Sequence, residues 1–147
     1  MATNKLIIRN YMTASPITIG KEQPLAVAHQ VMRQHHIRHL PVLEHGRLIG
    51  IVTERDLHLV ETLRDVDPVS VKVEEAMTLE PYTISPETSL EWVASEMAEH
   101  KYGAAVVVDA QHRVLGVFTT VDALRALQDL LADERRRHRS QGAPVSA

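Results

Sequence analysis

The sequence predicts an α/β (α+β) fold built from two related halves, and three observations support this prediction. A segment near the N-terminus, 12–19, recurs later in the chain as 77–84. The same order of strand and helix patterns follows each of the two segments. Aromatic residues make up only 3% of the chain and hydrophobic residues 44%, so aliphatic side chains must build most of the core.

The repeat preserves residue types as well as hydrophobicity, since both segments read Met-Thr-x-x-Pro-x-Thr-Ile. Further matches follow in one order, with one residue inserted in the second copy near Ala110-Gln111. They pair Glu22 with Glu87, Leu25 with Leu90, Met32 with Met97, His35 with His100, Val42 with Val107, Arg47 with Arg113, Gly50 with Gly116, Thr53 with Thr119 and Asp56 with Asp122. Chance hydrophobic patterning would not repeat Pro, Gly, Thr and Asp as well, so we expect the two halves to share a fold.

The first elements of each copy are a short strand and an amphipathic helix. The opening proline disfavours a helix and introduces the strand, over 17–19 or 82–84. The helix is predicted from apolar residues at helical spacing, namely Leu25, Ala28 and Met32 in one copy and Leu90, Val93 and Met97 in the other. In the second copy, Ser85 as cap and Pro86 in the first turn predict where this helix begins.

Two strands and a second helix complete each copy. The first strand covers 39–43 or 104–108, and the fully apolar Ala-Ala-Val-Val-Val of the second copy suggests burial on both faces. After a turn, the next strand covers 48–52 or 114–118, and a helix opens at Thr53 or Thr119. Each half is therefore predicted as strand, helix, strand, strand, helix.

The chain divides into three predicted parts. Residues 1–66 form the first motif with a lead-in, 67–131 form the second motif, and 132–147 form a polar, arginine-rich tail. A single motif is too small to bury its sheet well, so we expect the two motifs to pack through their sheets. We expect the last helix to fray from Ala132 and the tail to be disordered.

The composition excludes several classes of function. The chain has no cysteine, so disulfides and thiolate chemistry are ruled out, and its net charge of −3 gives no general attraction to nucleic acid or membranes. No apolar run approaches the roughly 20 residues of a membrane helix, and the N-terminus lacks a signal-peptide pattern. No nucleophile elbow, phosphate-binding glycine loop or metal-ligand cluster is present. We therefore expect a soluble, cytoplasmic protein that is not an enzyme.

These repeated motifs resemble the CBS domain family. The resemblance rests on the two Met-Thr-x-x-Pro-x-Thr-Ile segments and on three further stretches, 37–42, 50–57 and 116–123, and it covers roughly residues 10–130. It implies a Bateman module, in which two motifs pack through their sheets and leave two clefts. Such clefts bind adenosine-containing ligands: AMP, ADP or ATP here, with NAD or S-adenosylmethionine also possible.

The resemblance also implies a regulatory function. Ligand binding would transmit a conformational change to a separately encoded partner protein, with no cofactor required, and the module would form a flat homodimeric disc. A ligand-free dimerisation or scaffold module with vestigial clefts is the alternative. An interaction with nucleic acid through the arginine-rich tail is the weakest hypothesis.

Thr53 and Asp56 are the leading candidate ligand residues. A carboxylate accepts hydrogen bonds from the two vicinal hydroxyls of a ribose, and a hydroxyl at a helix start lies beside free backbone N–H groups that favour phosphate. The resemblance assigns the same role to this Thr-x-x-Asp. A threonine followed three residues later by an acid is also a capping box, which would only stabilise the helix end. Thr119 and Asp122 hold these positions in the second cleft.

Three basic residues of the first copy complete the predicted phosphate site. The resemblance places Arg38 and His39 at the phosphates, and Arg55 lies between Thr53 and Asp56. The second copy has Gly103, Ala104 and Val121 at the matching positions, so the two clefts should differ in their attraction for anions.

The remaining candidates are an adenine pocket and a group of histidines. The predicted adenine pocket consists of Ile17, Ile37, Pro41 and Tyr82, each of which could equally belong to the core. The histidines His35, His36 and His39 lack acidic residues at matching spacing, so we predict no metal site.

Overall fold

Two four-stranded sheets form the framework of the chain, whose computed structural model describes residues 6–63 and 65–140. The first half contains β2 (Ile19–Gly20), α1 (Leu25–His35), β3 (His39–Glu44), β4 (Arg47–Thr53) and α2 (Glu54–Glu61). The second half contains β6 (Thr83–Ile84), α4 (Leu90–His100), β7 (Ala104–Val108), β8 (Val114–Thr119) and α5 (Thr120–Ser140). The predicted order of strand, helix, strand, strand, helix is confirmed in both halves.

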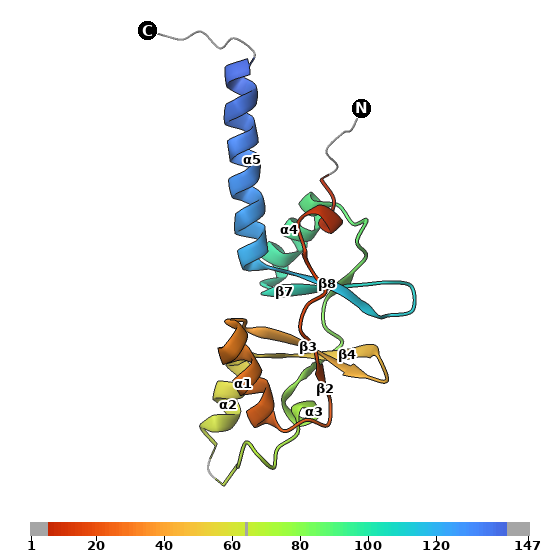
Figure 1. Cartoon of the computed structure of the whole chain (residues 1–147), viewed down its shortest axis with the longest axis vertical. Coiled ribbons are helices and arrows are strands. Elements are labelled where there is room, and N and C mark those ends of the chain that lie inside the picture. Colours follow the sequence, from red (N-terminus) through yellow and green to blue (C-terminus); the bar gives the residue numbers. More distant parts are fainter. Residues whose placement is uncertain (1–5, 64, 141–147) are drawn as a thin grey trace.

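The two sheets have the same internal pairing. In the first half β2 runs parallel to β3, and β3 pairs antiparallel with β4. In the second half β6 is parallel to β7, and β7 is antiparallel to β8. Figure 1 shows the sheets in the middle of the molecule, with α1, α2 and the short α3 (Val73–Ala76) at one end and α4 and α5 at the other.

The opening segment of each copy joins the sheet of the other half. Strand β1 (Thr13–Ala14) pairs with β8, and β5 (Thr78–Leu79) pairs with β4, so the sheet orders are β1-β8-β7-β6 and β2-β3-β4-β5. The 3-10 turn η1 (Ile8–Asn10) follows the same exchange, because Ile8 is fully buried in the core of the second half. Both crossovers tie the two halves together.

Glycines at equivalent positions permit this strand exchange. A Cβ added to Gly50 would lie 2.8 Å from the carbonyl oxygen of Thr78 and 2.7 Å from the sulfur of Met77. At Gly116 the corresponding distances are 2.8 Å to Thr13 and 2.6 Å to Met12. Only a residue without a side chain allows the exchanged strand to approach so closely.

The core has three parts. Each half has an apolar cluster beneath its helices, which includes Val42 and Val52 in the first half and Val107 and Phe118 in the second. A third cluster joins Leu48 and Ile51 to Val106 of the opposite sheet. The two motifs therefore pack through their sheets, as predicted.

Two local predictions about helices are wrong. Helix α4 begins at Leu90 after an N-cap at Ser89, not at Ser85-Pro86, because Ser85 and Thr88 instead form a hydrogen-bonded turn. Helix α5 continues to Ser140, so the predicted fraying and disorder from Ala132 do not occur up to that residue, and 141–147 lie outside the described residues. Ion pairs one turn apart, Arg136 with Asp133 and Arg137 with Glu134, help to extend this helix.

None of the helices in the described part of the chain combines the length and the apolar character needed to cross a membrane.

Candidate functional site

A cleft of about 270 Å³ opens between the two halves. The first half contributes residues from the start of β3 and the end of β4, and the second half contributes β5, the loop after it and the loop that follows α4. The lining residues are His39, Ile51, Thr53, Thr78, Glu80, Pro81, Tyr82, Lys101, Tyr102, Gly103 and Ala104. The cleft is thus built where the sheets meet, and neither half could form it alone.

Thr53 lies in this cleft and also caps α2. Its side chain accepts a 3.2 Å hydrogen bond from the backbone N–H of Asp56, and its own backbone N–H donates to Asp56 Oδ2 at 2.8 Å. This is a complete capping box. Asp56 is half-buried and stands one turn behind the cleft, since it is not one of the lining residues. Among the described residues, no hydrogen bond occupies its second carboxylate oxygen.

His39 forms one wall of the cleft. Burial lowers the pKa of His39 below its ordinary value of 6.5, the charge of Arg38 lowers it further, and Asp56 and Glu54 oppose these effects. The ring faces Gly103, where an added Cβ would lie 3.3 Å from Nε2. The glycine therefore keeps room for the imidazole, whose neutral form the burial favours.

Lys101 and Glu80 place one positive and one negative charge in the cleft. Lys101 ends α4 in the left-handed conformation, with φ 59°, and its backbone N–H donates to the carbonyl of Met97. Glu80 has φ 52°. The first copy repeats both conformations, with φ 56° at His36 and 49° at Ser15. Both conformations therefore belong to the repeated motif, where the left-handed residue after α1 and α4 is a common way to end a helix.

An aromatic stack borders the cleft. The rings of Tyr82 and Tyr102 lie 4.8 Å apart at 26°, and His100 continues the stack at 5.2 Å from Tyr102. The Tyr82 hydroxyl is buried without a hydrogen-bond partner in the described residues, and burial raises the pKa of Tyr82 above its ordinary value. Tyr102 is 38% exposed and offers an aromatic surface at the cleft.

The remaining candidates from the sequence do not line this cleft. Arg38 projects into solvent and approaches Glu54 at 3.8 Å, and Arg55 is exposed in the first turn of α2. Pro41 is buried in β3, and Ile37 packs against the core of the first half. Ile17 is exposed before β2. The structure thus brings together Thr53, His39 and Tyr82 from the predicted set.

Lys101 and Tyr102 were missed by the sequence analysis. In strict register Arg38 and His39 align with Gly103 and Ala104, so the second copy has no basic residue at these positions. A wider window would have found Lys101 two positions earlier, at the end of the predicted helix.

The second Thr-x-x-Asp differs strongly from the first. Asp122 is only 5% exposed, and its carboxylate accepts hydrogen bonds from the Thr119 backbone at 2.9 Å and from the Thr119 hydroxyl at 3.2 Å. Its other oxygen accepts a 2.9 Å hydrogen bond from the hydroxyl of Thr13, on the exchanged strand β1, and lies 3.6 Å from Arg125. Both oxygens of the Asp122 carboxylate therefore already accept hydrogen bonds from other residues of the chain.

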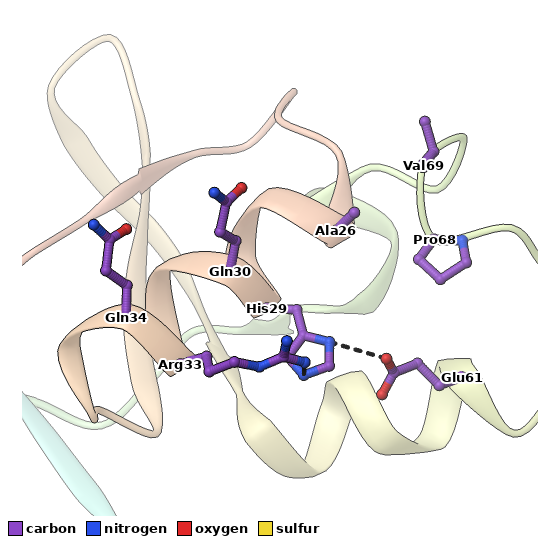
Figure 2. A pocket seen from close by; sticks show the side chains of 8 residues that line it. All are labelled: Ala26, His29, Gln30, Arg33, Gln34, Glu61, Pro68 and Val69. Atoms are coloured by element: carbon purple, nitrogen blue, oxygen red, sulfur yellow. Dashed lines mark hydrogen bonds and ion pairs between the residues drawn. The ribbon is translucent and has the colours of Figure 1, made fainter.

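A larger hollow of about 550 Å³ lies between α1 and α2 (Figure 2). His29 Nδ1 is 3.0 Å from a carboxylate oxygen of Glu61, and Arg33 lies 3.1 Å from the other ring nitrogen. Figure 2 shows these three side chains pointing toward one another, with Gln30 and Gln34 directed away from them. The charged groups satisfy one another, so the hollow lacks unpaired groups that converge on a ligand. In 6–63 and 65–140, no group of three acidic or histidine side chains could hold a metal ion.

Two curated relatives illustrate the sequence similarity. The chain is 31% identical over 115 residues to the CBS domain-containing protein YhcV of Bacillus subtilis, covering 78% of this chain and 81% of YhcV. It is 34% identical over 116 residues to inosine-5'-monophosphate dehydrogenase of Korarchaeum cryptofilum, covering 79% of this chain but only 22% of the enzyme. The chain therefore spans less than a quarter of this longer relative.

Solved structures share the fold. A Vibrio cholerae protein assigned to acetoin utilization (AcuB) superposes with a TM-score of 0.81 at 26% identity, covering 90% of this chain and 97% of that one. The CBS domain pair of MJ0100, solved with 5'-methylthioadenosine and S-adenosyl-L-methionine, gives 0.76 at 27% identity, with coverages of 84% and 96%. CBSX2 of Arabidopsis thaliana in complex with AMP gives 0.76 at 23% identity, with coverages of 84% and 97%.

The family assignment follows from the sequence repeat, the paired fold and these comparisons together. The CBS domain model matches residues 8–60 and 73–129, which are the two halves of the repeat. This chain belongs to the CBS domain family, as a tandem pair.

Proposed function

We propose that this chain is a regulatory module that binds an adenosine-containing nucleotide, of the AMP, ADP or ATP class, in the cleft between its two CBS motifs. NAD and S-adenosylmethionine share the adenosyl group and belong to the same test. The observation that carries the proposal is a cleft lined from both halves by a hydroxyl, a lysine and an aromatic stack.

The ribose belongs at Thr53 and Asp56. The hydroxyl of Thr53 lies in the cleft, and Asp56 keeps one carboxylate oxygen unused one turn behind it. A small rotation of the Asp56 side chain would let that oxygen accept from a ribose hydroxyl while the backbone hydrogen bond to Thr53 remains. The capping box and the ligand contact are therefore compatible roles for the same two residues.

The phosphates belong near Lys101 and His39. Lys101 is the lysine among the lining residues, and a phosphate beside His39 would favour the protonated imidazole that the free cleft disfavours. Arg38 and Arg55 are exposed outside the lining, so we assign them a weaker, longer-range attraction for the anion. Glu80 opposes this attraction and should limit the number of phosphates that bind well.

The adenine belongs against the aromatic stack. Tyr102 is partly exposed at the cleft and is supported from behind by Tyr82, so it presents a rigid flat surface. An adenine on this surface would place its ribose toward the first half. The adenosyl ligands of the MJ0100 pair and the AMP of CBSX2 support this class of ligand for a pair of CBS motifs.

Thermal unfolding with a panel of AMP, ADP, ATP, NAD and S-adenosylmethionine tests the proposal. A true ligand at a hundred times its Kd should stabilise the protein by roughly 2.7 kcal/mol. Asp56→Asn keeps an acceptor for the Thr53 N–H but removes the charge, and Lys101→Ala removes the cation. Both substitutions should therefore raise the apparent Kd of the nucleotide at least tenfold and make the thermal shift smaller. His36→Ala, at the equivalent position of the other half, is the matched control and should bind normally.

Regulation would follow from a change in the angle between the two motifs. A ligand can drive such a change only by as much as it prefers one arrangement. We propose that the changed surface acts on a separately encoded partner in the cytoplasm, that the module works as a homodimer, and that it catalyses no reaction itself.

A ligand-free scaffold is the second candidate, and Asp122 favours it for one cleft. That carboxylate is buried and bonded to Thr13 and Thr119, so it is not available to a ribose. If no adenosyl compound raises the unfolding temperature, the first cleft is vestigial as well and the scaffold function is correct.

A further inference from the structure

The turns of the two long hairpins meet at the ends of their strands that lie away from the nucleotide cleft. The β3–β4 turn is His45-Gly46, and the β7–β8 turn covers 109–113. The backbone N–H of Leu48 donates a 3.0 Å hydrogen bond to the carbonyl of His112, which joins the two hairpins across the halves. Figure 1 shows both hairpins projecting to the same side of the molecule, away from α5. Since β3 spans six residues, this edge lies about 20 Å from the cleft.

A hollow of about 440 Å³ lies at these turns, and its lining consists of polar side chains only. The lining residues are His45, Arg47, Gln111 and Arg113. Arg47 and Arg113 hold equivalent positions in the repeat, so each half contributes one arginine. No acidic side chain belongs to this lining, and each of the four side chains is able to donate hydrogen bonds. The hollow therefore suits a ligand that carries acceptors and negative charge.

The Asp109 carboxylate holds the second-half side of the hollow in place. Its Oδ1 accepts 2.9 Å hydrogen bonds from the backbone N–H groups of Gln111 and Arg113, and its Oδ2 accepts a 3.1 Å hydrogen bond from Arg113 Nε. Arg113 Nη2 also donates to Gln111 Oε1 at 3.3 Å. These bonds position the guanidinium and use only part of its set of N–H donors. Arg113 therefore keeps donors for a ligand.

Arg47 has no such counter-charge. Its cross-strand neighbour Glu44 forms an ion pair of 2.6 Å with Lys21 instead. Among the described residues, no carboxylate forms an ion pair with Arg47. The fold thus brings one unpaired arginine to the same hollow as a second arginine. Like charges repel at short range, and an anion bound between them would relieve this repulsion.

We propose that this hollow, named here the hairpin site (His45, Arg47, Gln111 and Arg113), binds a compact phosphate-bearing anion of the inorganic phosphate or pyrophosphate class. The planar guanidinium donates two parallel hydrogen bonds to phosphate oxygens, and one arginine from each half would contact the anion. The hairpin site shares no residue with the nucleotide cleft, so the inference goes beyond the proposed function.

The charges around the hairpin site favour a compact anion over a nucleic acid. A long polyanion binds through many phosphate contacts along a track of cations. Here the carboxylates of Glu44 and Asp109 flank the two arginines, and the chain has a net charge of −3. A small anion can contact the arginines without approaching these acids along an extended path.

Calorimetry with pyrophosphate at constant ionic strength gives the first test. The wild-type chain should bind pyrophosphate saturably, and Arg47→Gln and Arg113→Gln should each raise the Kd at least tenfold. Arg33→Gln removes the same charge from α1 and is the matched control, which should bind normally. Absence of saturable binding would overturn the proposal. An equal loss in Arg33→Gln would also overturn it, because general charge attraction would then explain the binding.

Amide chemical shifts separate the hairpin site from the nucleotide cleft. Pyrophosphate should shift the amide resonances of 45–48 and 111–113, and Lys101→Ala should bind pyrophosphate with an unchanged Kd. Shifts confined to 101–103, or a loss of binding in Lys101→Ala alone, would place the anion in the cleft and overturn the proposal. These expectations hold whether or not AMP binds the cleft, so either proposal can fail without the other.

Two further probes identify the source of the phosphate. If ATP shifts the amides of 45–48 and 111–113 in the Lys101→Ala variant, the hairpin site accepts the phosphate chain of a nucleotide. If only inorganic phosphate or pyrophosphate does so, the site accepts the free anion, and both results support the proposal. A single-stranded oligonucleotide should bind more weakly than pyrophosphate at the same ionic strength, and tighter binding would overturn the compact occupant.

Discussion

The hydroxyl of Thr13 donates a 2.9 Å hydrogen bond to the buried carboxylate of Asp122, which lies 109 positions later in the chain. The contact exists because β1 has crossed to the sheet of the second half. In the first half, β5 brings Thr78 to the equivalent place, but among the described residues Thr78 makes no hydrogen bond to Asp56. The threonine and the aspartate are therefore bonded to each other in the second half, as Thr13 and Asp122, but not in the first, as Thr78 and Asp56.

We predict that Thr13→Val destabilises the protein by about 1–2 kcal/mol. The substitution keeps the shape of the side chain but leaves one oxygen of a buried carboxylate without its donor. Thr78→Val is the matched control and should change the free energy of unfolding by less than about 0.5 kcal/mol. Urea denaturation of both variants measures the difference. Equal losses for the two variants would contradict the asymmetry between the halves.

Gly50→Ala and Gly116→Ala should each destabilise the protein by about 1–3 kcal/mol. A Cβ at either position would meet a backbone carbonyl oxygen of the exchanged strand at 2.8 Å, and this atom cannot rotate away as a flexible side chain would. Gly20→Ala is the control, because its Cβ would meet only Gln23 at 4.0 Å. Thermal unfolding compares the three variants, and tolerance of alanine at both 50 and 116 would show that the strands are not held so closely.

Lys101→Gly should make the protein more stable and its nucleotide binding weaker. Glycine relieves the left-handed conformation at φ 59°, which should contribute about 1 kcal/mol, while the cleft loses its lysine. His36→Gly relieves the same conformation at φ 56° in the other half and should stabilise without affecting binding. Unfolding temperature and calorimetric Kd, measured together, check both effects. Unchanged binding by Lys101→Gly would remove the lysine from the proposed phosphate site.

Acidification should destabilise the protein through His39. Burial lowers the pKa of His39 in the folded chain, so between that pKa and the ordinary value of 6.5 the unfolded chain binds more protons. The contribution to stability is therefore fully present above pH 6.5, decreases as the pH falls below it, and levels off below the folded pKa. In His39→Gln this pH dependence should be reduced, as measured by urea denaturation from pH 7.5 to 5. An identical slope in the variant would show that His39 is not the responsible group.

The repeat was sufficient to predict the elements and their packing, but not which sheet each opening strand joins. Both copies carry the same Met-Thr segment and the same glycine, so the pairing of Met12 with Gly116 looks as good in sequence as a pairing with Gly50. Only the folded arrangement distinguishes them. The extension of α5 was not predicted for a different reason: a polar, arginine-rich stretch is typical of a disordered tail, but here its charged residues pair one turn apart along the helix.

Only part of the site was predicted, because some of its residues belong to repeated motifs and others do not. Thr53 and His39 belong to motifs that the repeat and the family resemblance identify. Lys101 and Tyr102 belong to no repeated motif, and they reach the cleft only because α4 ends in a left-handed turn beside the other half. Contacts that depend on such a turn follow from the packing of the two halves rather than from local sequence.

The crossed opening strands also determine how the molecule can move. With β1 paired to β8 and β5 paired to β4, two strand pairings between the halves oppose their separation. A ligand bound between the halves, as proposed, would therefore change their relative angle rather than separate them. Helix α5 follows β8 directly and spans 21 residues, or about 30 Å. A change in the angle of β8 would therefore produce a larger displacement at the far end of this helix. A pivot of about 5° at its base would carry the far end through about 3 Å.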